Sequence, residues 1–182
     1  IISIEDLIDY QLKKGDLINK LEERKVKTAY GEFDFHAFQE KHTDQIHFAL
    51  TKGSWTDQDP VLVRVQSSSS YFDVLSRLSN GEKPLLEKIT SKITEEGQGA
   101  IIFINNVSNA ENTLRKLQQF NNFQDGQVEK PTVAANYMEY GIGTQILKKL
   151  GIKKFRVLSQ NIAQKPLISG YGVEVVEMVQ LD

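Results

Sequence analysis

Four consecutive serines, Ser67–Ser70, are the residues whose place in the sequence most favours chemistry. They follow the apolar, β-branched run Val61–Val65, which predicts a buried strand. α/β proteins usually place their functional groups directly after such a strand. Hydroxyls can bind a phosphate together with the backbone N–H groups of a helix that starts just beyond, but this run supplies no thiolate, carboxylate or imidazole. A phosphate site and an ordinary polar loop therefore both remain open.

The other candidate groups have simple structural interpretations. His36, His42 and His47 are the only histidines, and their spacing does not indicate convergence on a metal. We expect His47, on a predicted strand, to be a structural hydrogen-bonding residue. Asp57 and Asp59 have the oxygen ligands that a cation needs, but their place before a proline fits a solvated turn better.

The composition excludes several classes of function. Of 182 residues, 40% are hydrophobic and 25% are charged, and a net charge of −2 gives no electrostatic case for nucleic acid or an anionic membrane. The absence of cysteine excludes disulfides, thiolate-bound metals and a cysteine nucleophile. No run is apolar enough to span a membrane and no signal peptide is recognisable, so we expect a cytoplasmic protein. The chain opens on Ile1-Ile2 without methionine, which indicates a piece of a longer polypeptide.

The elements that must position these groups fall into two halves. In the first half, period-two alternation predicts strands at Val26–Tyr30, Phe33–Phe38 and Ile46–Leu50, with turns at Gly31 and Lys41–Asp44. These strands form an antiparallel or mixed sheet. Ahead of them, Ser3–Leu12 predicts a helix, and Asp16–Arg24 fits either further helical turns or the entry to a strand.

The second half alternates helix and strand, which predicts a partly parallel sheet with helices on its faces. The short apolar run Ala100–Ile104 fits a buried parallel strand. Residues 121–131 predict a long polar loop, and Thr132–Glu139 fits no element clearly. The predicted helices are Tyr71–Leu78, Leu85–Glu95, Ala110–Phe120 and Thr144–Leu150, with a short helix at Leu167–Gly170, and the remaining strands are Phe155–Leu158 and Val173–Val179. The fold class is α/β, with mixed sheets and flanking helices.

Several motifs align in order with one known family. The C-terminal ones are YGIGTQILKKLGIKK from Tyr140, FRVLSQN from Phe155 and GYGVEVVE from Gly170; the earlier ones are GEF from Gly31, HFAL from His47 and VLVRV from Val61. Together they resemble GTP cyclohydrolase II, which opens the imidazole ring of GTP at the first step of riboflavin biosynthesis. The resemblance covers roughly residues 26–181 and implies a GTP cyclohydrolase II-like fold for residues 26–182.

The resemblance also implies a neighbouring domain. The N-terminal stretch is similar to the linker that precedes this domain in chains that begin with 3,4-dihydroxy-2-butanone 4-phosphate synthase. We therefore expect residues 1–25 to be a linker or helix from a preceding synthase domain. The family likeness further implies a homodimer and GTP, or another phosphate-containing ligand, as the candidate small molecule.

The family's zinc site is missing from this sequence. Family members bind zinc through three cysteines, the first of which aligns with Ser69. Gln66 stands where the family has histidine, and Ser68 where it has glutamate. A serine hydroxyl stays protonated near neutral pH and is a far weaker zinc ligand than a thiolate. We expect no metal and no other cofactor here.

The family's catalytic groups are missing as well. Its arginine- and glycine-rich loop for GTP becomes a segment without either residue that begins at Phe103. Counting back from Tyr140 places Asn136 and Met138 at the family's catalytic aspartate and arginine, and an alignment anchored on Thr132 deletes both positions. The G-x-G motif that follows Tyr140, Gly141–Gly143, fits either a phosphate-binding loop or the packing of a helix start.

Some nucleotide-contacting positions are retained in part. They are Arg64, Ser67, Ser68, Thr132, Ser159 and Lys165, although Arg64 on a strand could equally pair with a carboxylate. The hypothesis from the sequence is a non-catalytic GTP cyclohydrolase II-like domain that supports or regulates a fused synthase. The alternatives are a nucleotide or phosphometabolite sensor and a divergent GTP ring-opening hydrolase.

Overall fold

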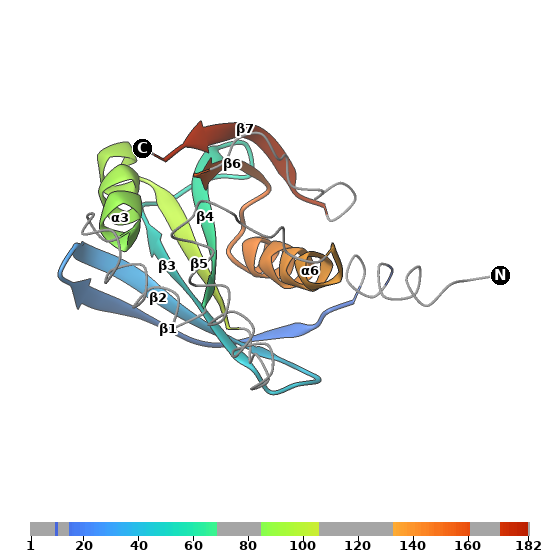
Figure 1. Cartoon of the computed structure of the whole chain (residues 1–182). Coiled ribbons are helices and arrows are strands. Elements are labelled where there is room, and N and C mark those ends of the chain that lie inside the picture. Colours follow the sequence, from blue (N-terminus) through green and yellow to red (C-terminus); the bar gives the residue numbers. More distant parts are fainter. Residues whose placement is uncertain (1–9, 11–14, 69–84, 106–132, 161–171, 182) are drawn as a thin grey trace, which may run out of the picture.

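A single seven-stranded mixed sheet with helices on both faces organises the computed structural model (Figure 1). The structure describes residues 10, 15–68, 85–105, 133–160 and 172–181. Along the sheet the strand order is β1-β2-β3-β5-β4-β6-β7. The predicted α/β class is therefore confirmed, and the strands of the described residues belong to one sheet.

The first half of the sheet is antiparallel, as predicted. Its strands are β1 (Ile18–Thr28), β2 (Gly31–Glu40) and β3 (Ile46–Lys52). Gly31 has a φ of +113°, which allows the tight turn between the first two strands.

Strand β1 starts earlier than the predicted strand at Val26. Of the two interpretations of Asp16–Arg24, the strand entry is the observed one, and the expected domain boundary at residue 26 falls within this strand. Ile18 is fully buried in the core and fixes the strand's start. The residues that follow are mostly charged and exposed because β1 is an edge strand, so the apolar alternation that identifies a strand is absent there.

The second half of the sheet is parallel, with β4 (Pro60–Ser68) at its centre. Its neighbours are β5 (Gly99–Asn105) on one side and β6 (Lys154–Ser159) on the other, and β7 (Glu174–Gln180) pairs with β6. Helix α3 (Leu85–Glu96) has nearly its predicted bounds. The predicted strands of this half are therefore all present, each within one to three residues of its expected ends.

Helix α6 (Val133–Lys149) begins well before its predicted start at Thr144. Gly141 and Gly143 therefore lie inside the helix, so neither the phosphate loop nor the helix start predicted for them is correct. A Cβ placed on Gly143 would meet Ile104 Cδ1 at 3.4 Å and Val65 Cγ1 at 3.8 Å. These are ordinary contact distances. The two glycines obscured the helical pattern because glycine is a poor helix former.

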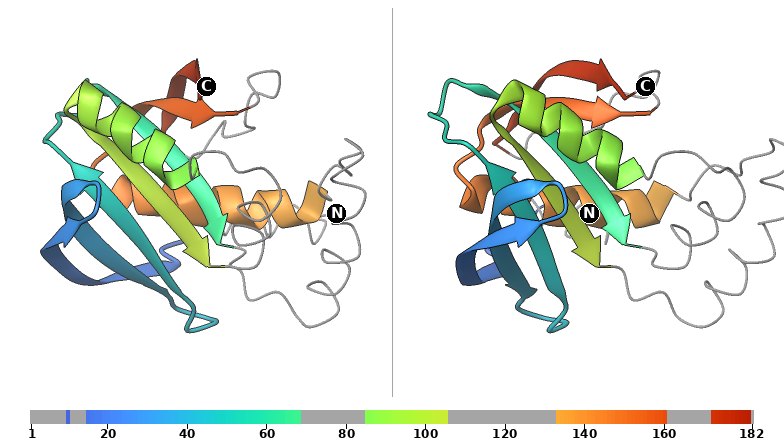
Figure 2. Two further views of the ribbon diagram at one scale, coloured as in Figure 1. Left: turned by 60° about the vertical axis from the view of Figure 1, so that its left-hand side comes forward. Right: turned by 90° about the vertical axis from the view of Figure 1, so that its left-hand side faces the viewer.

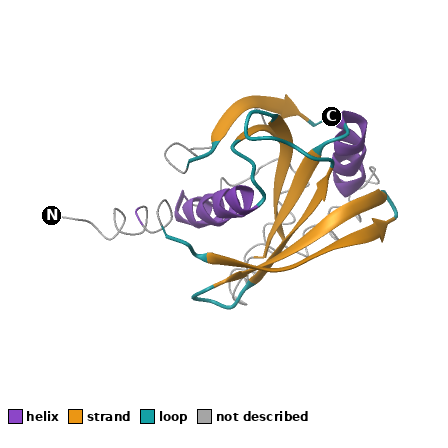
Figure 3. Ribbon diagram, turned by 180° about the vertical axis from the view of Figure 1, so that it is seen from behind, coloured by secondary structure: helices purple, strands orange, loops and turns teal. Residues whose placement is uncertain are grey.

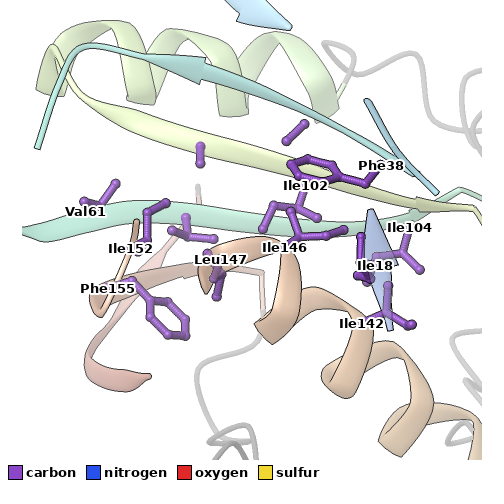
Figure 4. Close-up of a cluster of buried hydrophobic side chains, with 13 residues drawn as sticks. Ile18, Phe38, Val61, Ile102, Ile104, Ile142, Ile146, Leu147, Ile152 and Phe155 are labelled. Carbon is purple, nitrogen blue, oxygen red and sulfur yellow. The ribbon is translucent and has the colours of Figure 1, made fainter. Parts of the chain in front are cut away.

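The helices cover opposite faces of the sheet. In Figure 2, α3 lies in front of β4 and β5 and α6 lies behind them, and Figure 3 shows the same layers from the back. On the α6 face, Ile142 and Ile146 pack with Ile102 and Val61 in the larger hydrophobic cluster (Figure 4). On the α3 face, Ile89 and its neighbours pack against the other side of the same strands.

The chain enters the sheet through a set of polar contacts at residues 16 and 17. Asp16 forms ion pairs with Lys41 at 2.8 Å and Lys149 at 3.0 Å. The backbone N–H of Leu17 donates to the side-chain oxygen of the buried Gln145 at 2.8 Å. These contacts join the start of β1 to the end of α6. Within the described residues, no helix is long and apolar enough to cross a membrane.

Candidate functional site

The candidate site lies where β4 and β5 end side by side. The chain leaves β4 toward α3 on one face and leaves β5 toward α6 on the other face, so the two strands form a topological switch point. Ligands of open α/β sheets bind at this point, beyond the carboxyl ends of the strands. The predicted loop starts later than expected, because Ser67 and Ser68 still belong to β4 and pair with Ile104 and Asn105 of β5.

Arg64 approaches this edge from the α3 face of β4. Its Nη1 donates to the backbone carbonyl of Leu158 at 3.0 Å, and its Nη2 and Nε donate to Oε1 of Gln66 at 3.2 and 3.4 Å. Burial lowers the pKa of Arg64. The alternative that Arg64 pairs with a carboxylate is wrong for the described residues, since both of its partners there are neutral amide oxygens.

Beside this arginine, aromatic side chains form a ladder across the sheet. The Phe103 ring stacks on Phe48 with centroids 4.4 Å apart, and Phe48 stacks on Phe35 at 5.8 Å. The Arg24 guanidinium lies 5.4 Å from the centre of the Phe35 ring. Phe103, expected as a degenerate catalytic position, is thus part of the packing of the sheet, which is a structural role.

A pair formed by a buried imidazole and a partly buried carboxylate lies at the end of β5, and the carboxylate was not among the residues predicted from the sequence. His47 is fully buried; its Nδ1 accepts the backbone N–H of Asn105 at 3.0 Å, so its Nε2 carries the proton that is donated to Glu40 at 2.9 Å. The prediction that His47 is a structural hydrogen-bonding residue is confirmed. Glu40 could have been found from the register of the predicted hairpin, because the two residues flank its turn.

The remaining candidate positions have different outcomes. Ser159 ends β6, and its carbonyl accepts the N–H of Leu181 at 2.9 Å. Asn136 and Met138 belong to the first turns of α6. The positions that lie outside the described residues are Ser69, Thr132 and Lys165.

The residues at this edge do not fit the zinc ion that the family likeness implies. A zinc site of the family type needs thiolate ligands, and the chain contains no cysteine. Among the described residues, no group of three or more histidine, aspartate or glutamate side chains could hold a metal. The amide oxygen of Gln66 is engaged by Arg64. Nothing in this donor set replaces the missing sulfur.

The acidic turn before β4 is structural. Asp59 accepts hydrogen bonds from the backbone N–H of Thr56 at 2.6 Å and from its hydroxyl at 2.8 Å, which lower the pKa of this carboxyl. Asp57 pairs with Lys153. The solvated turn predicted for these carboxylates is confirmed, and the cation site is wrong.

The mixed sheet and its switch-point edge define an α/β domain of the kind that binds small ligands at strand ends. Comparison with known proteins makes this more specific. The family model of GTP cyclohydrolase II matches residues 19–180, so the chain belongs to the GTP cyclohydrolase II family.

Curated relatives carry names from riboflavin biosynthesis. The riboflavin biosynthesis protein RibBA of Cytophaga hutchinsonii is 34% identical over 190 residues, covering 100% of this chain and 46% of that protein. RibBA of Aquifex aeolicus matches with the same identity and coverage. A 3,4-dihydroxy-2-butanone 4-phosphate synthase of Photobacterium phosphoreum is 32% identical over 97% of this chain and 47% of its own length. The chain thus spans about half the length of the curated relatives it matches.

A solved structure has the same fold. It is described as RibBX, a two domain 3,4-dihydroxy-2-butanone 4-phosphate synthase from A. baumannii, and it matches with a TM-score of 0.64. The match covers 96% of this chain and 44% of that chain at 22% identity. At this identity the likeness establishes the fold alone.

Proposed function

We propose that this chain is a GTP cyclohydrolase II-like domain of riboflavin biosynthesis that does not open the ring of GTP. The main support for this proposal is the absence of cysteine from the chain, because the family's zinc-dependent hydrolysis uses cysteine ligands. The edge of β4 supports the same conclusion, because its arginine is bound to a neutral glutamine of the same strand. The domain would bind no zinc and no other cofactor.

The proposed role is structural or regulatory, toward a fused 3,4-dihydroxy-2-butanone 4-phosphate synthase domain. Relatives about twice the length of this chain, one of them named for that synthase, support a fused partner. The two-domain description of the A. baumannii protein points the same way. We further propose a homodimer in the cytoplasm, which size-exclusion chromatography with light scattering of the natural full-length polypeptide would test.

The catalytic part of the proposal is tested by GTP turnover in the full-length polypeptide. Formate and pyrophosphate release would be followed with and without added zinc, beside an active member of the family as positive control, and bound metal would be measured by mass spectrometry. We expect no turnover above the blank and no stoichiometric zinc. Release of formate from GTP, in either condition, would overturn the proposal.

One observation favours a second candidate, a sensor of a nucleotide or phosphometabolite. Arg64 is a half-buried cation whose described partners are all neutral, and such a group attracts anions. Isothermal titration with GTP separates the two roles. A scaffold produces no heat of binding, whereas a sensor produces a saturable signal that Arg64→Gln removes.

A further inference from the structure

The half-buried guanidinium of Arg64 is unusual in what surrounds it. A buried charge is normally matched by an opposite charge, because neutral acceptors recover only part of the lost hydration. Among the described residues, Arg64 instead has one backbone carbonyl, from Leu158, and one side-chain amide oxygen, from Gln66. Burial lowers its pKa, and no carboxylate of the described part of the chain opposes that shift. The site therefore has an unmatched positive charge.

Gln66 contacts the part of the guanidinium that binds oxyanions. An arginine grips a carboxylate or phosphate with two parallel N–H groups, one oxygen for each. Here a single amide oxygen takes both the Nη2 and Nε donors, at 3.2 and 3.4 Å. Both distances exceed the usual 2.7–2.9 Å of a charge-assisted pair, about what is expected when one oxygen serves two donors. Gln66 thus occupies the place that an oxyanion would take, and it binds the Arg64 guanidinium less well than an oxyanion would.

The placement of this pair makes the substitution consequential. Arg64 and Gln66 are two residues apart on β4, so both side chains point to the α3 face of the sheet. Leu158, which holds the other end of the guanidinium, is on the adjacent strand β6. The guanidinium is therefore fixed in position at the switch-point edge. Only the Gln66 side chain has to rotate to free the Nη2 and Nε donors of Arg64.

We propose that Gln66 is a built-in occupant of an oxyanion site at Arg64, and that this glutamine keeps inorganic phosphate and phosphate esters from binding there. The inference rests on the proposed function only in treating the domain as non-catalytic. Removal of the amide would uncover a phosphate site, and a carboxylate at the same position would close it permanently.

The test compares two substitutions of opposite effect. Gln66→Leu removes the competing oxygen at similar volume, and Gln66→Glu supplies a full counter-charge. Titration of the full-length polypeptide with inorganic phosphate should show binding at least about tenfold tighter in Gln66→Leu than in wild type, since a hydrogen bond to a charged group is worth roughly that factor or more. Gln66→Glu should bind no phosphate and should melt at a higher temperature than wild type.

A double variant shows whether the new site uses the arginine. Adding Arg64→Gln to Gln66→Leu should abolish the gained binding, and circular dichroism confirms that each variant is folded. Equal phosphate affinity in wild type and Gln66→Leu, or a gain that survives loss of Arg64, would overturn the proposal. Should Gln66→Leu not fold, Gln66→Ala takes its place with the same criteria, and a Gln66→Glu protein less stable than wild type also refutes it.

These outcomes are separate from those of the turnover assay. GTP hydrolysis by the wild type would refute the proposed function but leave the phosphate comparison valid, because binding of inorganic phosphate needs no zinc and no reaction. An unchanged phosphate affinity would refute the glutamine inference while the protein remained non-catalytic.

Discussion

Replacing His47 with leucine should destabilise the fold by about 3 kcal/mol. The substitution removes a neutral hydrogen bond from the N–H of Asn105, worth about 1 kcal/mol, and a charge-assisted one to Glu40, worth about 1.5–3 kcal/mol. Glu40 is only 16% exposed, so water compensates little of the second loss. Leucine adds apolar burial but leaves the carboxylate facing a hydrocarbon side chain, which opposes that gain.

Urea unfolding and thermal melting would measure this effect. For a chain of 182 residues, about 3 kcal/mol corresponds to a fall in Tm of roughly 6–12 °C. The matched control is His42→Leu, since His42 is exposed on the β2–β3 turn and its loss should cost no more than about 0.5 kcal/mol. Hydrogen exchange of the Asn105 amide should quicken only in the His47 variant. A His47→Leu protein that is as stable as the His42 control would refute the argument.

Three further predictions concern the packing and the charges of the fold. Gly143→Ala should stabilise the fold by about 0.5–1 kcal/mol in urea unfolding, because the added Cβ meets ordinary contacts in a helix interior. Gly99→Ala should destabilise the fold by about 1–3 kcal/mol, because its Cβ would lie 2.8 Å from a backbone oxygen of β4. Equal effects of the two substitutions would contradict this reasoning. Burial lowers the pKa of His36, so the unfolded chain binds the extra proton, and stability should be lost as the pH falls below about 6.5. His36→Gln should flatten this dependence in melts between neutral and mildly acidic pH. Hydrogen bonds from two lysines lower the pKa of Asp16, so its contribution to folding stability is present above the unfolded pKa and is lost as the pH falls below about 4. Asp16→Asn should remove that loss of stability. If the variant loses stability in acid as the wild type does, the ion pairs of Asp16 are excluded as its source.

The strands were predictable wherever at least one face of a strand is buried. In β3 every second residue from His47 to Thr51 is buried, and in β2 the apolar residues Phe33 and Phe38 are buried on opposite faces, so the hydrophobic pattern identified both strands. The start of β1 was not identified because an edge strand with exposed faces carries no such alternation. The early start of α6 was not identified for a different reason: Gly141 and Gly143 reduce the helix propensity of this segment, which hides its helical pattern in a single sequence.

The site was predictable in its position but not in its contacts. The end of a buried strand and the family motifs both pointed to the edge of β4, where the switch point lies. The partners of Arg64 were not predictable, because Leu158 is 94 residues away in sequence and Gln66 was considered only as a lost histidine. Predicting the pairing of Glu40 with His47 would have required the register of the β2–β3 hairpin, because the register decides which residues on either side of the turn lie close together.

Core and site are physically separated along β4, so the fold does not depend on the residues at the family's ligand positions. The first half of the strand, with Val61 and Val63 fully buried, contributes to the core between the sheet and α6. The second half, from Arg64 to the serines, contributes polar groups at the edge. Substitutions in that second half open no cavity in the core, so they escape the cost of about 2–5 kcal/mol that large-to-small core substitutions incur. A half-buried charge is the exception, because it is costly without a partner, and at Arg64 the amide of Gln66 reduces that cost.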